Sequence, residues 1–162
     1  MIALPRDPKR KFMKMAIDKS REGIARGQTP FGACVVNNGD VVSCAHNKVW
    51  ASTDITAHAE IVAIREACSK LGTINLSGCV IYATTEPCPM CFSAIHWANI
   101  GEVVFGASIA DAKAYGFHEL TISNEAMKEM GQSKVKITRG FMAREALAVF
   151  IEWAARTGRK TY

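Results

Sequence analysis

Residues 87–91 read Pro-Cys-Pro-Met-Cys, and this stretch restricts the fold more than any other part of the chain. Cysteines three positions apart lie on one face of a helix, so Cys88 and Cys91 can direct both thiols to one point. A proline is tolerated in the first turn of a helix, where its missing N–H would have no partner, but not in the helix interior. The stretch therefore predicts the first turn of a helix that brings two sulfur atoms to a shared site.

A second polar segment, His58-Ala59-Glu60, predicts the start of another helix, with 27 residues between Glu60 and Cys88. A helix N-terminus favours the thiolate form of cysteine. Two thiolates and one imidazole suit Zn²⁺, and three protein ligands leave one tetrahedral position for water. These reasons agree with a known motif pattern, quoted below, whose match predicts a zinc site formed by His58, Cys88 and Cys91. Glu60 is placed to take a proton from that water and to deliver protons to a substrate.

Two other interpretations of the cysteine pair are a structural zinc site and a redox pair. A structural site requires a fourth protein ligand, and the candidates His46, His96 and His118 lack convincing spacing. A redox pair leaves His58 and Glu60 unexplained. A zinc or interaction module without turnover has no need of a general base, so Glu60 argues against that class as well.

The other cysteines fall in predicted strands or on a helix stripe, which favours small core residues over metal ligands. They are Cys34, Cys44, Cys68 and Cys79. The first 14 residues contain no apolar run long enough for a secretion signal. No stretch approaches the ~20 apolar residues of a membrane span. We expect a cytoplasmic protein with reduced thiols and no membrane association.

The chain of 162 residues has a net charge of +5, but the excess lies at its ends. Residues 1–28 carry eight Lys or Arg against three Asp or Glu, and residues 139–162 carry five against two. Residues 29–138, which contain the cysteine pair, carry seven against ten. The termini could contact a polyanion such as a nucleic acid, but the acidic middle of the chain gives this partner little support.

The remaining pattern is one of helices alternating with strands. Residues 8–26 predict an amphipathic helix, and residues 31–47 predict a hairpin around an Asn-Asn-Gly-Asp turn. The helix that starts near His58 has an apolar stripe formed by Ile61, Ile64, Cys68 and Leu71. Gly72 can end this helix.

Further strands are predicted over residues 79–84, 101–108 and 134–138, and further helices over 87–99, from about 111, and over 142–156. Alternation of this kind predicts an α/β fold, a three-layer α-β-α sandwich with a central mixed sheet. The length suits a single domain over residues 1–162.

The two polar segments match the signature H-x-E followed by P-C-x-x-C of zinc-dependent nucleobase deaminases. From about Thr29 to Tyr162 the chain resembles the cytidine deaminase superfamily, and its stretches TAHAEIVAIREAC and EPCPMCFSAIHWA are most similar to bacterial guanine deaminases. The tRNA adenosine deaminases share the zinc motifs. The resemblance implies a cytidine deaminase-like fold with zinc between two helices and a homodimer. It also implies a C-terminal segment exchanged between subunits, and hydrolysis of guanine to xanthine and ammonia.

The resemblance also implies a set of substrate contacts. Asn47 matches an asparagine that hydrogen-bonds the purine, and Phe31 matches an aromatic residue that packs on the base. The main chain at Ala59 would contact the edge of the base. Trp97 and Tyr162 match aromatic positions that close the pocket.

One motif departs from the guanine deaminase pattern. Those enzymes carry Gly-Phe-Asp-Asp, whose second aspartate assists proton transfer at the substrate amine, whereas residues 116–119 here read Gly-Phe-His-Glu. Glu119 keeps the carboxylate but reaches one methylene further, and His118 adds a titratable group. Such a change can redirect specificity. Guanine is therefore the leading expected substrate, with guanosine, another aminopurine, an amino-triazine or the adenosine of a tRNA as alternatives.

Overall fold

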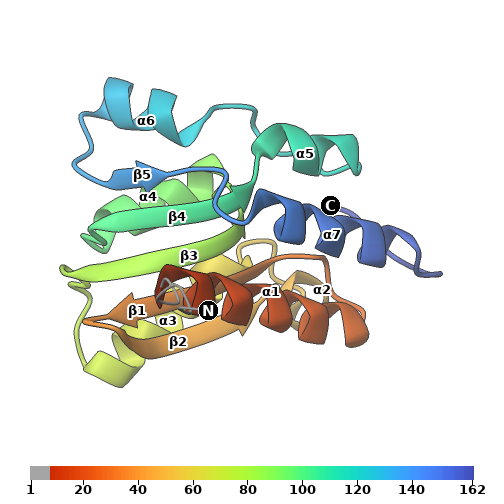
Figure 1. Ribbon diagram of the computed structural model, residues 1–162, viewed down its shortest axis with the longest axis horizontal. Helices are drawn as coiled ribbons and strands as arrows, with labels where there is room; N and C mark the ends of the chain where they lie inside the picture. Colours follow the sequence, from red (N-terminus) through yellow and green to blue (C-terminus); the bar gives the residue numbers. More distant parts are fainter. Residues whose placement is uncertain (1–7) are drawn as a thin grey trace, which may run out of the picture.

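The computed structural model describes residues 8–162, whose strands form one sheet of order β2-β1-β3-β4-β5 (Figure 1). The strands are β1 (Gly32–Asn37), β2 (Asp40–His46), β3 (Cys79–Thr85), β4 (Glu102–Ala107) and β5 (Lys136–Thr138). Strand β1 is antiparallel to both β2 and β3, whereas β3, β4 and β5 run parallel to one another. The predicted mixed sheet is therefore confirmed.

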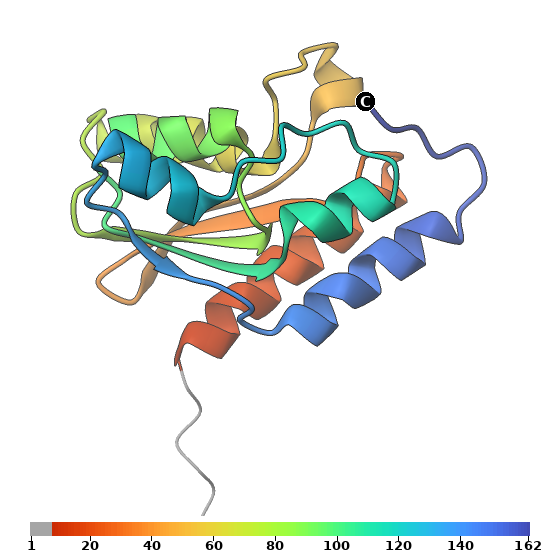
Figure 2. The ribbon, with the colours of Figure 1, turned by 90° about the horizontal axis from the view of Figure 1, so that it is seen from above.

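Helices cover both faces of this sheet (Figure 2). On one face α1 (Pro8–Ala25) and α7 (Ala143–Ala154) lie side by side. The opposite face carries α3 (Ala59–Leu71), α4 (Pro89–Trp97) and α6 (Asn124–Gly131). The short helices α2 (Val49–Ser52) and α5 (Ile109–Ala114) lie at the end of the sheet where β3 and β4 finish. This arrangement confirms the predicted three-layer sandwich.

The first seven residues, which include Arg6 and Asp7 of the basic N-terminal segment, lie outside the described residues. The prediction of a single domain over residues 1–162 therefore extends beyond what the structure describes. Between residues 8 and 162, no helix combines the length and the apolar character that crossing a membrane requires.

The β1–β2 hairpin has the turn that the sequence predicts. Asn38 and Gly39 adopt φ angles of 49° and 85°, the left-handed conformations that a type I′ turn needs. The hairpin also positions a residue of the site, because the N–H of Asn47, directly after β2, donates to the carbonyl of Phe31, directly before β1 (3.1 Å).

The face through which helix α3 packs on the sheet coincides only in part with the predicted stripe, because Ile64 is buried and Cys68 packs against the core, whereas the rest of the stripe is not buried. Its buried side chains are Ala59, Glu60, Val62, Ala63, Ile64 and Ala67. Ile61 is half-buried and Leu71 is exposed, whereas Gly72 ends the helix with a φ of 66° as expected. Because alanine side chains are short, the helix comes close enough to β2 for the Ser43 hydroxyl to donate to the Ala63 carbonyl (2.7 Å). The prediction counted large apolar residues and so missed this alanine face.

The single helix predicted from about residue 111 is wrong, because two helices separated by a loop occupy this region. Ser108 starts α5 with a capping box in which Asp111 bonds back to the Ser108 N–H. Gly116, with a φ of 93°, follows the end of α5, and Ser123 caps the start of α6. The loop between the helices, residues 115–123, approaches the site described below.

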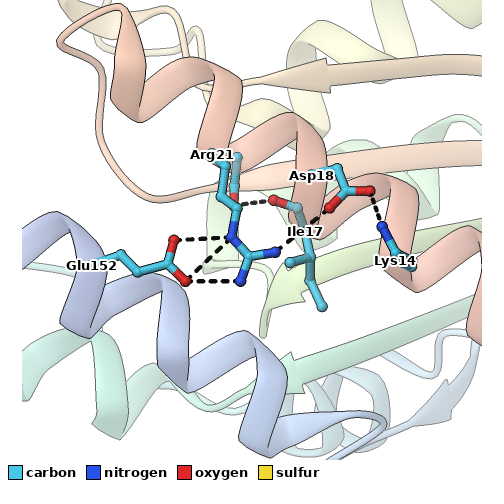
Figure 3. A network of polar contacts seen from close by, with 6 residues as sticks. Lys14, Ile17, Asp18, Arg21 and Glu152 are labelled. Carbon is cyan, nitrogen blue, oxygen red and sulfur yellow. Dashed lines mark hydrogen bonds and ion pairs between the residues drawn. The ribbon is translucent and has the colours of Figure 1, made fainter.

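An ion-pair network links α1 to α7 (Figure 3). The guanidinium of Arg21 donates to both carboxylate oxygens of Glu152, at 2.9 and 2.8 Å, and lies 3.5 Å from a carboxylate oxygen of Asp18. Lys14 also pairs with Asp18. Partly exposed pairs of this kind contribute only ~0.2–1 kcal/mol each, and of those named here the Arg21–Glu152 pair joins the two helices.

The close contact between α1 and β1 generates a stability prediction. A Cβ atom added at Gly32 would lie 2.1 Å from the Ala16 carbonyl oxygen and 2.9 Å from the Ser20 nitrogen. Both are main-chain atoms that cannot rotate away, so we expect Gly32→Ala to lower the free energy of unfolding by about 1–3 kcal/mol. Gly131→Ala is the control, because a Cβ there meets nothing within 4 Å. Urea titration of both variants measures the effect, and equal stabilities would contradict the packing argument.

Candidate metal centre and its pocket

The first turns of α3 and α4 bring three metal-ligand side chains together. His58 is the N-cap residue of α3 and Cys88 is the N-cap residue of α4, both with extended backbone angles. Neither side chain caps its own helix by a hydrogen bond, so the imidazole and the thiol remain directed at each other. Pro89 occupies the first helical position of α4, as predicted, and Cys91 follows one turn after the cap.

The distances between these side chains fit a tetrahedral zinc ion. The His58 Nδ1 atom lies 3.6 Å from the sulfur atom of Cys88 and 3.6 Å from that of Cys91. Zn–S bonds of ~2.3 Å and Zn–N bonds of ~2.0 Å at tetrahedral angles place such atoms about 3.5 Å apart. Within residues 8–162 this is the one cluster of His, Cys, Asp or Glu found with ligand atoms close enough to share an ion.

The alternative of a structural zinc site lacks its fourth protein ligand among the described residues. His46 is bound through Nδ1 to the Asn47 carbonyl (2.7 Å), and His96 through Nδ1 to the Ser133 hydroxyl (2.9 Å). His118 lines the adjacent pocket but is outside the cluster. A three-ligand site with one open position is the arrangement typical of catalytic zinc.

Without a cation between them, the two thiols have pKa values shifted in opposite directions. The hydrogen bond from Cys91, together with His58, lowers the pKa of Cys88 to about 4. The same interaction raises the pKa of Cys91, because a second thiolate beside the first is unfavourable in a buried site. A divalent cation between the two sulfur atoms removes this repulsion, so the chemistry of the pair fits a metal site.

Glu60 lies in the first turn of α3 and is 7% exposed. Burial raises the pKa of this carboxyl to about 7, an effect that His58 opposes and the Cys88 thiolate reinforces. Its side chain interacts with Cys91, one of the predicted ligands. The structure therefore places a buried carboxyl beside the metal ligands, as the sequence predicted.

A pocket of about 260 Å³ opens directly over the metal centre. Its walls come from α4, from the loop between α5 and α6, and from the C-terminus. The lining residues are Ile55, His58, Cys88, Pro89, Met90, His118, Glu119, Leu120 and Tyr162. The volume lies just below the ~300–1,000 Å³ of pockets for drug-sized ligands, so a small molecule fits it best.

Tyr162, the last residue of the chain, closes one side of this pocket. Its ring lies 5.4 Å from the His58 ring and packs edge-on against Phe117 at 5.7 Å. Its hydroxyl accepts a hydrogen bond from the Asn47 side-chain amide and lies 3.4 Å from the Thr29 hydroxyl. Burial raises the pKa of Tyr162 well above its ordinary value, so the phenol stays neutral.

Asn47 is fully buried beside the pocket. Its side-chain oxygen accepts from the N–H of Val49 (3.0 Å), which orients the amide NH₂ group towards Tyr162. The predicted contact residues Asn47 and Tyr162 therefore lie together in one hydrogen-bonded unit at the site.

Glu119 lies in the loop between α5 and α6 and lines the pocket. Its Oε2 atom is buried and has no hydrogen-bond partner among the described residues. Burial, followed by the nearby Cys88 and Glu60, raises the pKa of Glu119 to about 8. The adjacent main chain is tied to the C-terminus, because the His118 N–H donates to the Tyr162 carbonyl (3.4 Å).

The other predicted contact residues occupy different environments. Ala59 is fully buried next to His58. Phe31 packs edge-on against Phe117 (4.8 Å) and is 8% exposed, so it supports the pocket from within the core. Trp97 is the last residue of α4 and is 83% exposed, beside a separate hollow between α4 and α6. Within one chain, the structure does not bring Trp97 to the pocket.

Two buried polar residues next to the metal-binding turn were missed. Glu86 directly precedes the Pro-Cys pair, and its carboxylate accepts hydrogen bonds from the main chain at the starts of α5 and α6. Asn124, at the start of α6, donates through its side chain to the Pro87 carbonyl (2.7 Å). The glutamate in the stretch Thr-Glu-Pro-Cys was the one sequence signal for this role. Its hydrogen-bond partners could not be read from the sequence, because they lie more than 20 positions away.

Comparison with known proteins agrees with this geometry. Residues 6–107 match the family model described as the cytidine and deoxycytidylate deaminase zinc-binding region. Guanine deaminase of Bacillus subtilis (strain 168) is 37% identical over 152 residues, which cover 93% of this chain and 97% of that protein. The tRNA-specific adenosine deaminase of the same organism is 35% identical over 134 residues, which cover 83% of this chain and 81% of that protein.

Solved structures of deaminases are also similar to this chain. Guanine deaminase from Nitrosomonas europaea has a TM-score of 0.83 and 27% identity, and the match covers 96% of each chain. The protein NE0047 in complex with 2,6-diaminopurine has a TM-score of 0.86 and 29% identity, over 96% of this chain and 86% of that chain. The cytidine deaminase-like fold expected from the sequence is therefore confirmed.

The metal centre generates a prediction about metal content. We expect about one zinc per chain in protein purified without added metal, and loss of that zinc in Cys91→Ala, because two ligands do not hold the ion firmly. Cys44→Ala is the matched control, since Cys44 lies in β2 outside the cluster. Elemental analysis measures both variants. Full zinc content in Cys91→Ala would exclude this site.

Proposed function

The chain belongs to the cytidine and deoxycytidylate deaminase zinc-binding family, and from this premise we propose that it hydrolyses guanine to xanthine and ammonia with the help of zinc. The observation that carries the proposal is the small pocket over the three-ligand cluster, closed by the chain's own C-terminal tyrosine. The similarity to guanine deaminases over almost the whole chain supports the same substrate. The binding of 2,6-diaminopurine by NE0047 supports a purine base.

In this proposal His58, Cys88 and Cys91 hold the ion. Zinc, when bound, activates water as a nucleophile by lowering its pKa towards ~7. Glu60 takes a proton from the water that adds to the amine-bearing carbon, and passes it to the neighbouring ring nitrogen. A second proton goes to the amine, the carbon–nitrogen bond breaks, and ammonia leaves as the carbonyl forms. A buried carboxyl beside the ligands suits this repeated proton transfer.

We assign Glu119 to the departing amine. Its buried Oε2 atom lacks a partner among the described residues, and an unpaired buried oxygen is well suited to bind a substrate N–H. The position of Glu119 in the wall of the pocket that His58 also lines supports the assignment. The side chain of Glu119 is one methylene longer than the second aspartate of the Gly-Phe-Asp-Asp pattern. Glu119 is therefore the candidate for tuning specificity.

We further propose that Asn47 hydrogen-bonds the base and that the main chain at Ala59 contacts its edge. The hydrogen bond from the Asn47 amide to Tyr162, which lines the pocket, supports this role. Phe31 contributes indirectly, by supporting Phe117 beneath Tyr162.

A homodimer in the cytoplasm is the expected setting. The surface between α4 and α6 exposes large apolar side chains, Trp97 and Met130, which suits a contact between subunits. In this arrangement Trp97 belongs to an interface and does not wall the pocket of its own chain.

The tRNA adenosine deaminase alternative is favoured by several relatives that are tRNA-specific adenosine deaminases, and by the basic ends of the chain. The charges of α1 give it little support, because most of them are neutralised within the protein. The paired cations are Lys9, Arg10, Lys14, Lys19, Arg21 and, just after the helix, Arg26. The pocket closed by Tyr162 also favours a free base over a nucleotide within a long RNA.

The test is ammonia release from a panel of guanine, guanosine, other aminopurines, amino-triazines and a tRNA. We expect guanine to have the highest kcat/KM, with little dependence on salt, because phosphate contacts are absent from its recognition. Glu60→Gln is the matched control, which should retain zinc and lose ~10²–10⁴-fold or more in kcat. Steeply salt-dependent activity on tRNA alone would replace the proposal with the alternative.

The tail generates a second prediction. A chain that ends at Gly158 should fold and bind zinc but lose about 10- to 100-fold in kcat on guanine, because water enters and the substrate is held less firmly. Tyr162→Phe should lose less, since it keeps the ring over His58. Steady-state kinetics and zinc analysis measure both. Full activity of the truncated chain would show that the tail does not close the pocket.

Mixing experiments distinguish tails on their own chain from the exchanged tails that the family resemblance implies. Full-length Glu60→Gln chains are mixed with truncated chains that retain Glu60. We expect no recovery of activity, because Tyr162 reaches the site of its own chain in the structure. Recovery would show that one subunit's tail completes the other's site.

A further inference from the structure

We propose that Glu86 is a positioning residue that holds the segment carrying Glu119 against the start of the metal-binding helix α4. The proposal rests on the role given above to Glu119. It concerns a buried carboxylate outside the pocket lining, one to which neither the zinc motifs nor the substrate contacts assign a function.

The side chain of Glu86 joins the starts of two helices. Its Oε2 atom accepts from the N–H of Ile109, the first residue of α5 (3.2 Å), and its Oε1 atom accepts from the N–H of Asn124, the first residue of α6 (2.9 Å). Helix N-termini offer unsatisfied N–H groups and a positive dipole end, so one carboxylate serves both. Glu86 itself is fixed, because it is 7% exposed and its own N–H donates to the Ala107 carbonyl at the end of β4 (2.8 Å).

A return hydrogen bond completes the link to the metal centre. Asn124 is fully buried, and its side-chain NH₂ donates to the carbonyl of Pro87 (2.7 Å). Pro87 directly precedes Cys88, the N-cap ligand of α4. The hydrogen bonds of Glu86 and Asn124 therefore tie the starts of α5 and α6 to the turn that presents the first cysteine.

Glu119 lies between the two tied ends, ten residues after Ile109 and five before Asn124. Residues 117–123 are neither helix nor strand, so no ladder of main-chain hydrogen bonds fixes this carboxyl. Phe117 anchors the near side of the loop, as it is 2% exposed among other aromatic rings. The far side depends on Asn124, and through it on Glu86.

A double-mutant cycle separates positioning from a general loss of stability. Glu86→Gln keeps the size of the side chain but replaces one acceptor oxygen with an NH₂ group that faces a main-chain N–H. We expect kcat on guanine to fall about 10- to 100-fold with unchanged zinc content and little change in KM, because the carboxyl of Glu119 is displaced. In the Glu119→Gln background, Glu86→Gln should cost less than about twofold more, since the group it positions is gone.

Ser123→Ala is the stability control. It removes the hydroxyl that caps α6 at Ala126 while leaving both Glu86 bonds in place, so it should lower the melting temperature without a comparable loss of kcat. Asn124→Ala removes only the hydrogen bond to Pro87. If Glu86→Gln does not fold, the same double-mutant cycle is measured with Asn124→Ala in its place.

Two results overturn the proposal, and they are distinguishable. Losses from Glu86→Gln and Glu119→Gln that multiply in the double variant, or a loss in Ser123→Ala that matches Glu86→Gln, would make Glu86 purely structural. Wild-type kcat in Glu119→Gln would instead remove the role of Glu119, and the positioning proposal with it. Glu60→Gln kinetics stay unaffected by either result, so the deaminase function itself is tested separately.

Discussion

The rest of the site depends on the electrostatics at the starts of α3 and α4, where the metal ligands lie. The N-terminal ends of α3 and α4 present His58 and Cys88 to the same point, and each end contributes a positive dipole that favours thiolates. Two buried thiolates repel each other, which is why the pKa values of Cys88 and Cys91 separate so widely without a cation. A divalent ion held by the two sulfur atoms would remove this repulsion, and Glu60 lies buried beside the same ligands.

This constraint explains how the fold distributes rigidity. The metal ligands lie at the starts of α3 and α4, which pack on the same face of the sheet, where shifts are opposed by close packing. Two of the proposed substrate-contacting residues, Glu119 and Tyr162, come from less regular segments, namely the loop over residues 115–123 and the tail after α7. Such segments can vary between relatives without disturbing the metal site, which is how one scaffold serves both free bases and tRNA.

The features predicted from sequence are those that depend on near neighbours in the chain. The hairpin turn at Asn38 and Gly39, the proline at the start of α4 and the metal cluster follow from local backbone chemistry and ligand spacing. The helix expected from about residue 111 failed because Ser108 and Gly116 delimit a shorter helix. Glu86 was missed for a different reason, since its hydrogen-bond partners are set by how α5 and α6 are arranged in space.

The position of Tyr162 depends on an interaction far from the metal. The eight residues from Ala155 to Tyr162 span at most roughly 26–29 Å when extended, so the end of α7 decides which sites the tail can reach. Near that end, Glu152 pairs with Arg21 on α1. An ion pair of this kind contributes little stability of its own. From there the tail passes to Asn47 and His58, where its phenol and ring find hydrogen-bonding and aromatic partners. This surface ion pair thus helps to set where the C-terminal tail begins.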